Sequence, residues 1–360
     1  MPEQMTSKER VMTALDFRQP DRVPVSQSFW AEFRELWEQE KDPSISESVD
    51  DYFLEDIFIA VGDETPYCTW AEELGEDGDY LIARDGWGQT KRTKRGGYFY
   101  EQLSFAYDED ANLVYGEFDP PDLPERYERL DAVMPQRKER YAVFAKTGGP
   151  FIRTYFMRGE VPYLMDMAGD PSLAAELTMR TARHLTAIGL EELRRWDLYD
   201  TGVWIFDDMA SAKGPMFSPA TAEKVLAPAW KHMIDAFRGA GARKVILHSD
   251  GNIGPLLDLF LDLGFDGINP VEYHTGLHPL ALREKYGDRL ALLGGLCNAI
   301  ILPRGDPAEV REHVLEVLAS GVEGGLVIGT HSVAPDISVA TMELVRNLVL
   351  EYGRYPMQLP

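Results

Sequence analysis

The sequence predicts an α/β fold: a (β/α)8 TIM barrel with an N-terminal helical extension and a β-hairpin insertion. Two observations support this prediction. Eight short apolar runs alternate with amphipathic helical patterns along the chain. The 360 residues also exceed a bare barrel of about 250 residues by roughly a hundred, which leaves room for an insertion. We therefore expect a single barrel domain over residues 1–360, with an insertion at residues 66–135.

The helical elements are predicted from their apolar spacing and from their start signals. An amphipathic pattern at residues 6–15 predicts the N-terminal helix, and Pro20 and Pro24 then bracket the entry to the first strand. Asp170 and Pro171 mark the start of a long helix. The further helices are expected at residues 30–39, 45–54, 172–195 and 220–240.

The predicted strands are short apolar runs that end at turn residues. They cover residues 23–28, 57–63, 141–149, 202–208, 245–250, 267–272, 290–296 and 325–330. Between the second and third strands the βα alternation is lost. Alternating aromatic residues with turn signals there predict a hairpin, followed by a Pro-rich loop and a short helix. The basic run at residues 91–95 lies in this hairpin, where we expect a solvated strand or turn face.

Composition excludes several classes of function. Sixty Asp and Glu against 36 Lys and Arg give a formal charge of −24, which would repel nucleic acid and an anionic membrane surface. Cys68 and Cys297 cannot form a disulfide framework, and the polar start of the chain does not resemble a secretion signal. No apolar run reaches the about 18–20 residues of a spanning helix. We expect a cytoplasmic protein, a monomer or a homodimer, that acts on a small molecule.

Ionisable side chains recur where the predicted strands end. They are Asp63, Asp207, Asp208, His248, Asp250, Glu272 and His331. In a closed barrel the carboxyl ends of the strands surround one cavity, so these side chains are expected to share a site. A single Asp at such a position is equally explained as a helix cap, but the recurrence over five strands favours the shared site. Arg153 and Tyr155 follow the third strand and are expected on the same face.

Several motifs together resemble the uroporphyrinogen decarboxylase superfamily, which also contains corrinoid-linked methyltransferases acting on coenzyme M and related acceptors. The motifs are Arg10-Val-Met-Thr-Ala-Leu, Pro20-Asp-Arg-Val-Pro-Val, Asp207-Asp-Met-Ala-Ser-Ala-Lys-Gly-Pro-Met-Phe-Ser-Pro, His248-Ser-Asp-Gly-Asn, Asn269-Pro-Val-Glu, Tyr286-Gly-Asp-Arg-Leu-Ala-Leu-Leu-Gly-Gly and Ile328-Gly-Thr-His-Ser-Val-Ala-Pro-Asp. The resemblance covers most of the chain. It is specific for the superfamily and not for one activity.

The methyltransferase branch implies a metal site. Its members hold zinc with a His-x-Cys pair after strand five and a Cys after strand eight, and here His248, Asp250 and His331 stand at those positions. The similar cobalamin-independent methionine synthases add a Glu after strand six, which matches Glu272. The resemblance thus implies His248, Asp250, Glu272 and His331 as metal ligands. Because both thiolates are replaced, such a site would be harder and weaker for zinc.

The decarboxylase branch implies a different role for the same cavity. There an Asp after strand two binds pyrrole NH groups, and Asp63 resembles it. The Arg-rich N-terminal signature that grips the substrate carboxylates is missing, since only Arg34 follows the first strand.

Three hypotheses follow. The first is methyl transfer from a methyl-corrinoid on a partner protein. In it, zinc is the metal, and Asp207, Asp208 and His248 are the candidate catalytic residues, of which Asp207 and Asp208 position substrate or cofactor. The alternative is metal-free decarboxylation of uroporphyrinogen or another carboxylate in porphyrin metabolism, with Asp63 as the catalytic residue. The third is a barrel that binds a small molecule or a corrinoid protein without chemistry. Arg153, Tyr155 and Asn269 are the expected substrate-binding residues.

Overall fold

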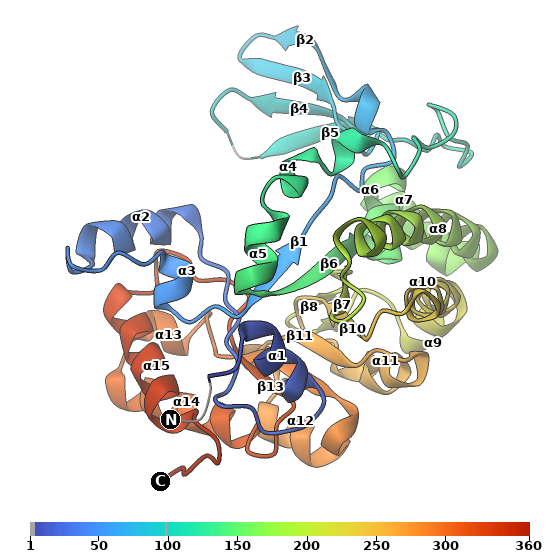
Figure 1. Cartoon of the computed structure of the whole chain (residues 1–360). Coiled ribbons are helices and arrows are strands. Elements are labelled where there is room, and N and C mark those ends of the chain that lie inside the picture. The colour runs from blue at the N-terminus through green and yellow to red at the C-terminus, as the bar shows by residue number, and fades with distance from the viewer. Residues whose placement is uncertain (1–3, 98) are drawn as a thin grey trace.

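The computed structural model describes residues 4–97 and 99–360. A curled sheet of seven parallel strands forms its centre, in the order β1-β6-β7-β10-β11-β12-β13 (Figure 1). The strands are β1 (Ile57–Ala60), β6 (Ala142–Gly148), β7 (Gly202–Phe206), β10 (Lys244–His248), β11 (Gly267–Val271), β12 (Ala291–Gly295) and β13 (Leu326–Gly329). Each overlaps a predicted strand, so the predicted α/β barrel architecture is confirmed.

The predicted first strand closes the barrel through very few backbone contacts. Val25 bridges in parallel to Glu55 on one side and to Ile328 of β13 on the other. Beyond Val25, the backbone N–H of Gln27 donates to the carboxylate of Glu55 at 2.6 Å, where a ladder would require a main-chain carbonyl. Within the described chain, Val25–Glu55 is the only backbone bridge between this segment and the start of β1, so the two separate towards their carboxyl ends.

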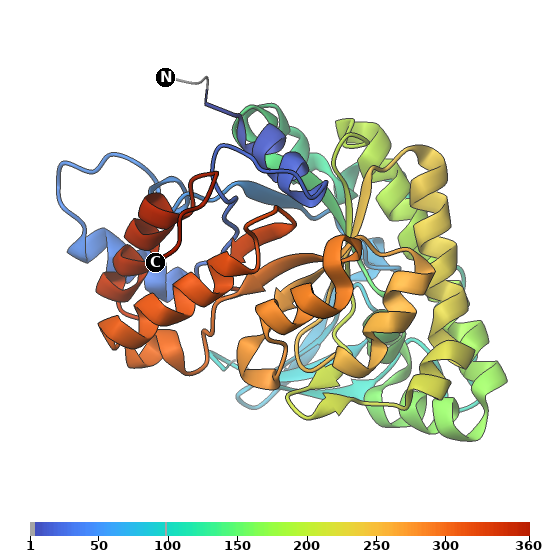
Figure 2. The same cartoon turned by 90° about the horizontal axis from the view of Figure 1, so that it is seen from below.

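Helices surround the sheet, as the view from below shows (Figure 2). They are α1 (Ser7–Leu15), α2 (Ala31–Glu40), α3 (Val49–Tyr52), α4 (Glu128–Asp131), α5 (Met134–Arg140), α6 (Pro150–Arg158), α7 (Glu160–Gly169), α8 (Pro171–Trp196), α9 (Pro219–Thr221), α10 (Ala227–Ala240), α11 (Leu257–Leu263), α12 (Pro279–Tyr286), α13 (Ile301–Arg304), α14 (Pro307–Ala319) and α15 (Val339–Tyr352). Short 3-10 turns lie at Cys68–Trp70, Pro124–Arg126, Gly254–Leu256, Tyr273–Thr275 and Gly287–Arg289. Among the described residues, no helix is both long and apolar enough to cross a membrane.

Two predicted helices differ from the structure. The helix expected at residues 45–54 is reduced to α3, because Ser48 caps it only at that point and Leu54 has a positive φ of 67° that ends it. The helix expected at residues 220–240 is interrupted by a π-helical turn at Ala222–Leu226. Pro228 follows this turn and has no N–H to donate, which breaks the regular hydrogen-bond ladder.

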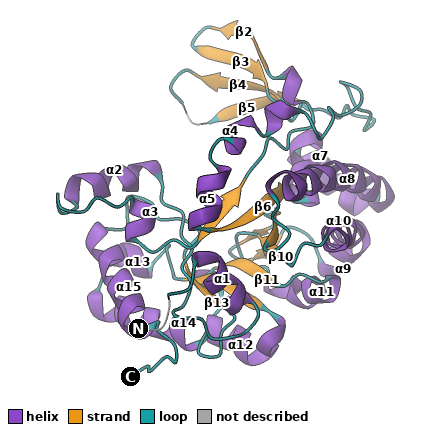
Figure 3. Cartoon of the chain, viewed as in Figure 1, coloured by secondary structure: helices purple, strands orange, loops and turns teal. Residues whose placement is uncertain are grey.

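The insertion is larger than the predicted hairpin. It forms an antiparallel sheet of four strands, β2 (Glu72–Asp77), β3 (Tyr80–Arg84), β4 (Thr90–Lys94) and β5 (Tyr100–Ser104), at one edge of the barrel (Figure 3). The acidic, exposed β2 lacks the apolar alternation that would have predicted it. The basic residues of β4 pair with acidic neighbours, Lys91 with Asp85 at 2.5 Å and Arg92 with Asp77 at 2.8 Å, as expected of a solvated face.

The barrel interior is packed and is sealed at its amino-terminal end. Inward side chains of the strands, among them Phe144, Trp204 and Leu293, form one apolar cluster with Val11 and Leu15 of α1. The helix α1 therefore closes the end of the barrel opposite the predicted site. A small hairpin, β8 (Ala210–Ser211) and β9 (Gly214–Pro215), lies beyond the carboxyl end of β7.

A buried ion cluster ties α1 to the barrel. Arg10 donates to Asp56 at 2.7 Å and to both oxygens of Asp21 at 2.7 and 2.8 Å. Arg22 also donates to Asp56, at 2.7 and 3.1 Å, and the N–H of Val25 donates to it at 2.9 Å. Arg10 and Asp56 are 3% and 0% exposed, so the cluster is shielded from solvent. The motifs at residues 10–15 and 20–25 therefore build the base of the barrel and lie away from the cavity.

Candidate metal centre

The carboxyl ends of three strands bring the four predicted metal ligands near one another. His248 is the last residue of β10 and Asp250 follows it, while Glu272 follows β11 and His331 follows β13. The Asp250 Oδ1 atom lies 3.7 Å from His248 Nε2 and 3.7 Å from His331 Nε2. His331 Nδ1 lies 3.8 Å from Glu272 Oε1. Asp250 is thus the common neighbour of both histidines.

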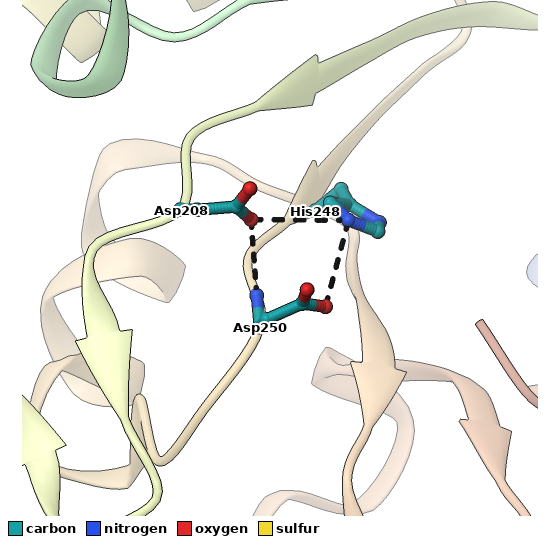
Figure 4. A group of neighbouring side chains, drawn as sticks. All are labelled: Asp208, His248 and Asp250. Carbon is teal, nitrogen blue, oxygen red and sulfur yellow. Dashed lines mark hydrogen bonds and ion pairs between the residues drawn. The ribbon is translucent and has the colours of Figure 1, made fainter. Parts of the chain in front are cut away.

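Asp208, predicted as a positioning residue, belongs to the same cluster (Figure 4). Its Oδ1 accepts from the backbone N–H of Asp250 at 3.2 Å and lies 3.9 Å from His248 Nε2. Two overlapping groups result, Asp208 with His248 and Asp250, and Asp250 with Glu272 and His331. Within each group the ligand atoms lie within 4.8 Å of one another.

The neighbours of His248 hold its ring in the orientation that a metal ligand would need. Its ring stacks on Phe206 with centroids 4.0 Å apart, and its Nδ1 lies 2.6 Å from Asn269 Oδ1. The Asn269 amide nitrogen donates to the Leu293 carbonyl at 3.4 Å, which leaves its oxygen to accept a proton from His248 Nδ1. The lone pair of Nε2 then faces the carboxylates. Burial lowers the pKa of His248 to about 4, which favours the neutral form that binds metals.

Two observations show that the cluster could accept a cation: an unpartnered carboxylate oxygen and the separations between the ligand atoms. Asp250 Oδ1 is buried and has no hydrogen-bond donor among the described residues, although its side chain is partly exposed. Burial raises the pKa of Asp250 to about 6. Two ligands bound to one zinc ion at tetrahedral angles lie about 3.4 Å apart, close to the separations seen here. Each of the two groups of three therefore offers ligand atoms for a divalent cation, with a harder character than a thiolate site, and the two groups share Asp250.

Asp207, predicted to be catalytic, is turned away from this cluster. It is fully buried, and its carboxylate accepts from Trp230 Nε1 at 2.7 Å and from the backbone N–H groups of Ile152 and Phe151 at 2.8 and 3.3 Å. It thus caps the first turn of α6. Burial raises its pKa to about 7. Of the two consecutive carboxylates, the structure brings only Asp208 to the site, because their side chains point in opposite directions.

Asp63 also lies apart from the cluster. Its exposed carboxylate accepts from the backbone N–H and the hydroxyl of Thr65 at 2.9 and 2.6 Å. The next residue, Glu64, is buried instead and pairs with Lys146 at 3.0 Å and Arg153 at 2.5 Å. These two cations help hold the pKa of Glu64 at about 2 against the effect of burial. The strand β1 ends at Ala60, whereas the predicted strand ran to residue 63. The alternation of side chains along a strand therefore does not extend to Asp63 and could not predict where its side chain points.

Replacing Asp63 with asparagine is expected to leave turnover within about twofold of wild type. An amide oxygen can still accept from Thr65, and no other charged group depends on this exposed carboxylate. Steady-state kinetics with whichever substrate the wild type turns over would check this. A loss of tenfold or more would place Asp63 in the reaction after all.

Of the three expected substrate-binding residues, only Asn269 lies beside the predicted ligands. Arg153 pairs with Glu64 and packs over Trp87 at 4.9 Å, while the Tyr155 hydroxyl donates to Glu160 at 2.9 Å. Both lie on α6, where residues two apart point in different directions, and neither lines the cavity that borders His248, so their part in substrate binding stays a prediction. Asn269 lines the main cavity and positions His248.

The cluster of predicted metal ligands borders, at His248 and His331, a cavity of about 580 Å³ that runs through the barrel wall. The gap between the segment around Gln27 and β1 forms this passage. We call its two ends the inner lobe, inside the barrel, and the outer lobe, beyond β1. The inner lobe is lined by Ile57, Ile59, Trp204, Phe206, His248, Asn269, Thr330 and His331; the outer lobe by Arg34, Asp50, Phe58, Val61, Arg137 and Tyr141; the passage by Ser26, Gln27, Ser28 and Glu55.

Sequence reasoning missed the passage and the outer lobe. Ile57 packs inside the barrel with Trp204, whereas its neighbour Phe58 packs outside against Tyr141. A cavity that touches both must pass the edge of β1. Arg137 lies on α5 before a strand, where nothing in the sequence indicated a site.

Comparison with known proteins supports the fold and identifies a family. One solved structure that resembles the chain is a methyltransferase from Methanosarcina mazei, with a TM-score of 0.69 and 18% sequence identity over 97% of this chain and 99% of that one. At this identity the likeness shows the fold. No curated protein matches the chain in sequence. The model of the uroporphyrinogen decarboxylase (URO-D) family matches residues 105–352, well over half of the sequence. The chain therefore belongs to the uroporphyrinogen decarboxylase family.

Proposed function

We propose that this protein is a metal-dependent methyltransferase whose ion, with zinc as the first candidate, is held by His248, Asp250, Glu272 and His331. One observation carries the proposal: Asp250 Oδ1 is buried without a donor, at 3.7 Å from a nitrogen of each histidine. Buried carboxylate oxygens are normally satisfied, and a cation at this point would satisfy this one. The methyltransferase named among the similar structures supports the choice of chemistry.

The residues of the chain would then have separate tasks. A bound ion would act as a Lewis acid that lowers the pKa of an acceptor thiol or another nucleophile. Asn269 keeps the His248 proton on Nδ1, and Phe206 fixes the ring from one face. Asp208, exposed beside His248, is placed to orient the reactant. We propose a methyl-corrinoid on a partner protein as the methyl donor.

Metal analysis of the purified protein tests the proposal. We expect close to one equivalent of a divalent ion after preparation without chelators, and its loss on dialysis against a strong chelator. If the protein contains no ion and takes up none from added zinc, cobalt or manganese, the proposal fails.

Decarboxylation is the second function to test, because the family is named for uroporphyrinogen decarboxylase. The structure brings neither Asp63 nor Arg153, the residues assigned to it, into the cavity. Two arginines, Arg34 and Arg137, line that cavity, which is few for a substrate with many carboxylates. We expect no consumption of uroporphyrinogen in an anaerobic assay in which a known decarboxylase consumes it. Consumption at a comparable rate would favour decarboxylation.

Substitutions of Asp250 should move zinc affinity in opposite directions. Asp250→Cys places a soft thiolate, with its Zn–S distance of about 2.3 Å, where a carboxylate stands, and should raise the affinity. Asp250→Ala removes a ligand and should lower it. Competition with a chromophoric chelator measures both. If neither variant differs from wild type, Asp250 does not contact the ion, and its role is local to the turn that Gly251 begins.

A further inference from the structure

The outer lobe contains a guanidinium group that has no carboxylate partner among residues 4–97 and 99–360. Arg137 of α5 is half-buried and packs over Phe58 at 4.9 Å and over Tyr141 at 5.7 Å. Among the described residues it forms no ion pair, and its Nε is buried without a hydrogen-bond partner. This is unusual in a chain of net charge −24, where acidic partners are abundant.

The other charged groups of the outer lobe do not neutralise Arg137. Arg34 and Asp50 satisfy each other through two hydrogen bonds of 2.9 and 2.7 Å. Glu55, in the passage, accepts from the backbone N–H groups of Gln27 and Ile57 at 2.6 and 3.1 Å. Burial raises the pKa of Glu55 well above its usual value, which favours the uncharged acid. The outer lobe therefore retains one uncompensated positive charge.

The aromatic neighbours make this charge suitable for recognition. Stacking on Phe58 and Tyr141 holds the planar group in place, so little side-chain entropy remains to be lost on binding. A guanidinium held in this way can bind a carboxylate or a similar oxyanion through two hydrogen bonds. The same cavity borders His248 and His331 at its other end.

We infer that the substrate is an elongated anion that threads the barrel wall, with its reacting end in the inner lobe at His248 and His331 and its carboxylate or similar oxyanion in the outer lobe at Arg137. The inner end of this inference rests on the proposed function, whereas the anion site at Arg137 does not. Between the two ends, Gln27 lines the passage with a buried side-chain oxygen that has no partner among the described residues. The other residues of the passage are polar as well, and apolar contacts for the carbon chain of the substrate come from Ile57 and Ile59 in the inner lobe and from Phe58 in the outer lobe.

The anion site is tested first, without metal. Octanoate and 1-octanol serve as probes of equal length, and isothermal titration calorimetry measures their binding. We expect octanoate to bind the wild type about 10- to 100-fold more tightly than octanol, as hydrogen bonds to a charged group produce. Arg137→Met should remove this preference, and Arg137→Lys should keep part of it. Arg140→Gln is the matched control, because Arg140 lies on the same helix, pairs with Asp51 and does not line the cavity.

The bridging of the two lobes is tested in the metal-loaded protein with a series of ω-mercaptoalkanoates. One chain length should bind best, because only that length places the thiol in the inner lobe and the carboxylate at Arg137 together. Arg137→Met should abolish this optimum. Equal binding of octanoate and octanol by the wild type, or a preference that survives in Arg137→Met, would overturn the anion site. A preference for octanoate without an optimum among the thiols would overturn the bridging. Carboxylate recognition without any metal binding would contradict the proposed function alone.

Discussion

Asp56→Ala is expected to destabilise the protein by about 3–5 kcal/mol, since one partner of a buried ion cluster is removed. Asp56 is fully buried and accepts from Arg10, Arg22 and the N–H of Val25. Without it, the Arg22 guanidinium loses its only carboxylate among the described residues, and Arg10 keeps only Asp21. The change also frees α1 and the first strand from the start of β1. Urea denaturation, followed by far-ultraviolet circular dichroism, should show a large fall in midpoint.

Asp200→Ala provides the matched control for this prediction. Asp200 also ties α1 to the barrel, through Lys8 at 2.6 Å, but the two side chains are 54% and 46% exposed. Exposed pairs of this kind contribute about 0–1 kcal/mol. If the two variants have the same midpoint, the burial of the cluster does not matter for stability.

His248→Ala is expected to lower the affinity for the bound ion by at least about 100-fold, because losing a ligand costs more than losing the groups that orient one. The substitution should disturb the backbone little, since the side chains of Phe206 and Asn269 hold the His248 ring and the main chain does not. Metal content by mass spectrometry and methyl transfer to a thiol should fall together.

Two further variants separate ligation from packing. His248→Phe can keep the stacking on Phe206 but has no nitrogen, so it should lose the ion as His248→Ala does. His274→Ala removes an exposed histidine outside both ligand groups and should keep it. Retention of the ion by His248→Phe would contradict the assignment of His248 as a ligand.

The strand ends were the most predictable part of this protein. Seven parallel strands and the residues that follow them could be read from apolar runs that stop at Gly and Pro, and this placed His248, Asp250, Glu272 and His331 near one another. Directions within loops could not be read in this way. Asp63 and Asp207 each sit beside a residue that faces the other way, and one step of the backbone decides which of the two points inward.

The passage through the wall had no sequence signal for a related reason. Residues 23–28 were predicted as a full strand, but the pairing that they make depends on where Glu55 places its side chain. Contacts between distant segments of this kind are determined by packing and not by local pattern. The role of Arg137 follows from the same tertiary arrangement.

Because the barrel is closed at the Glu55 side chain, the residues that set the width of the passage differ from the residues that pair the strands. In a fully paired barrel the same residues would do both. Seven strands carry the continuous ladders, while Gln27, Ser28 and Glu55 line the passage and lie outside those strands. Substitutions at these three positions can widen or narrow the opening without changing the register of any paired strand. The protein can therefore adapt to substrates of different girth through a few side chains, while the scaffold that holds the metal ligands stays the same.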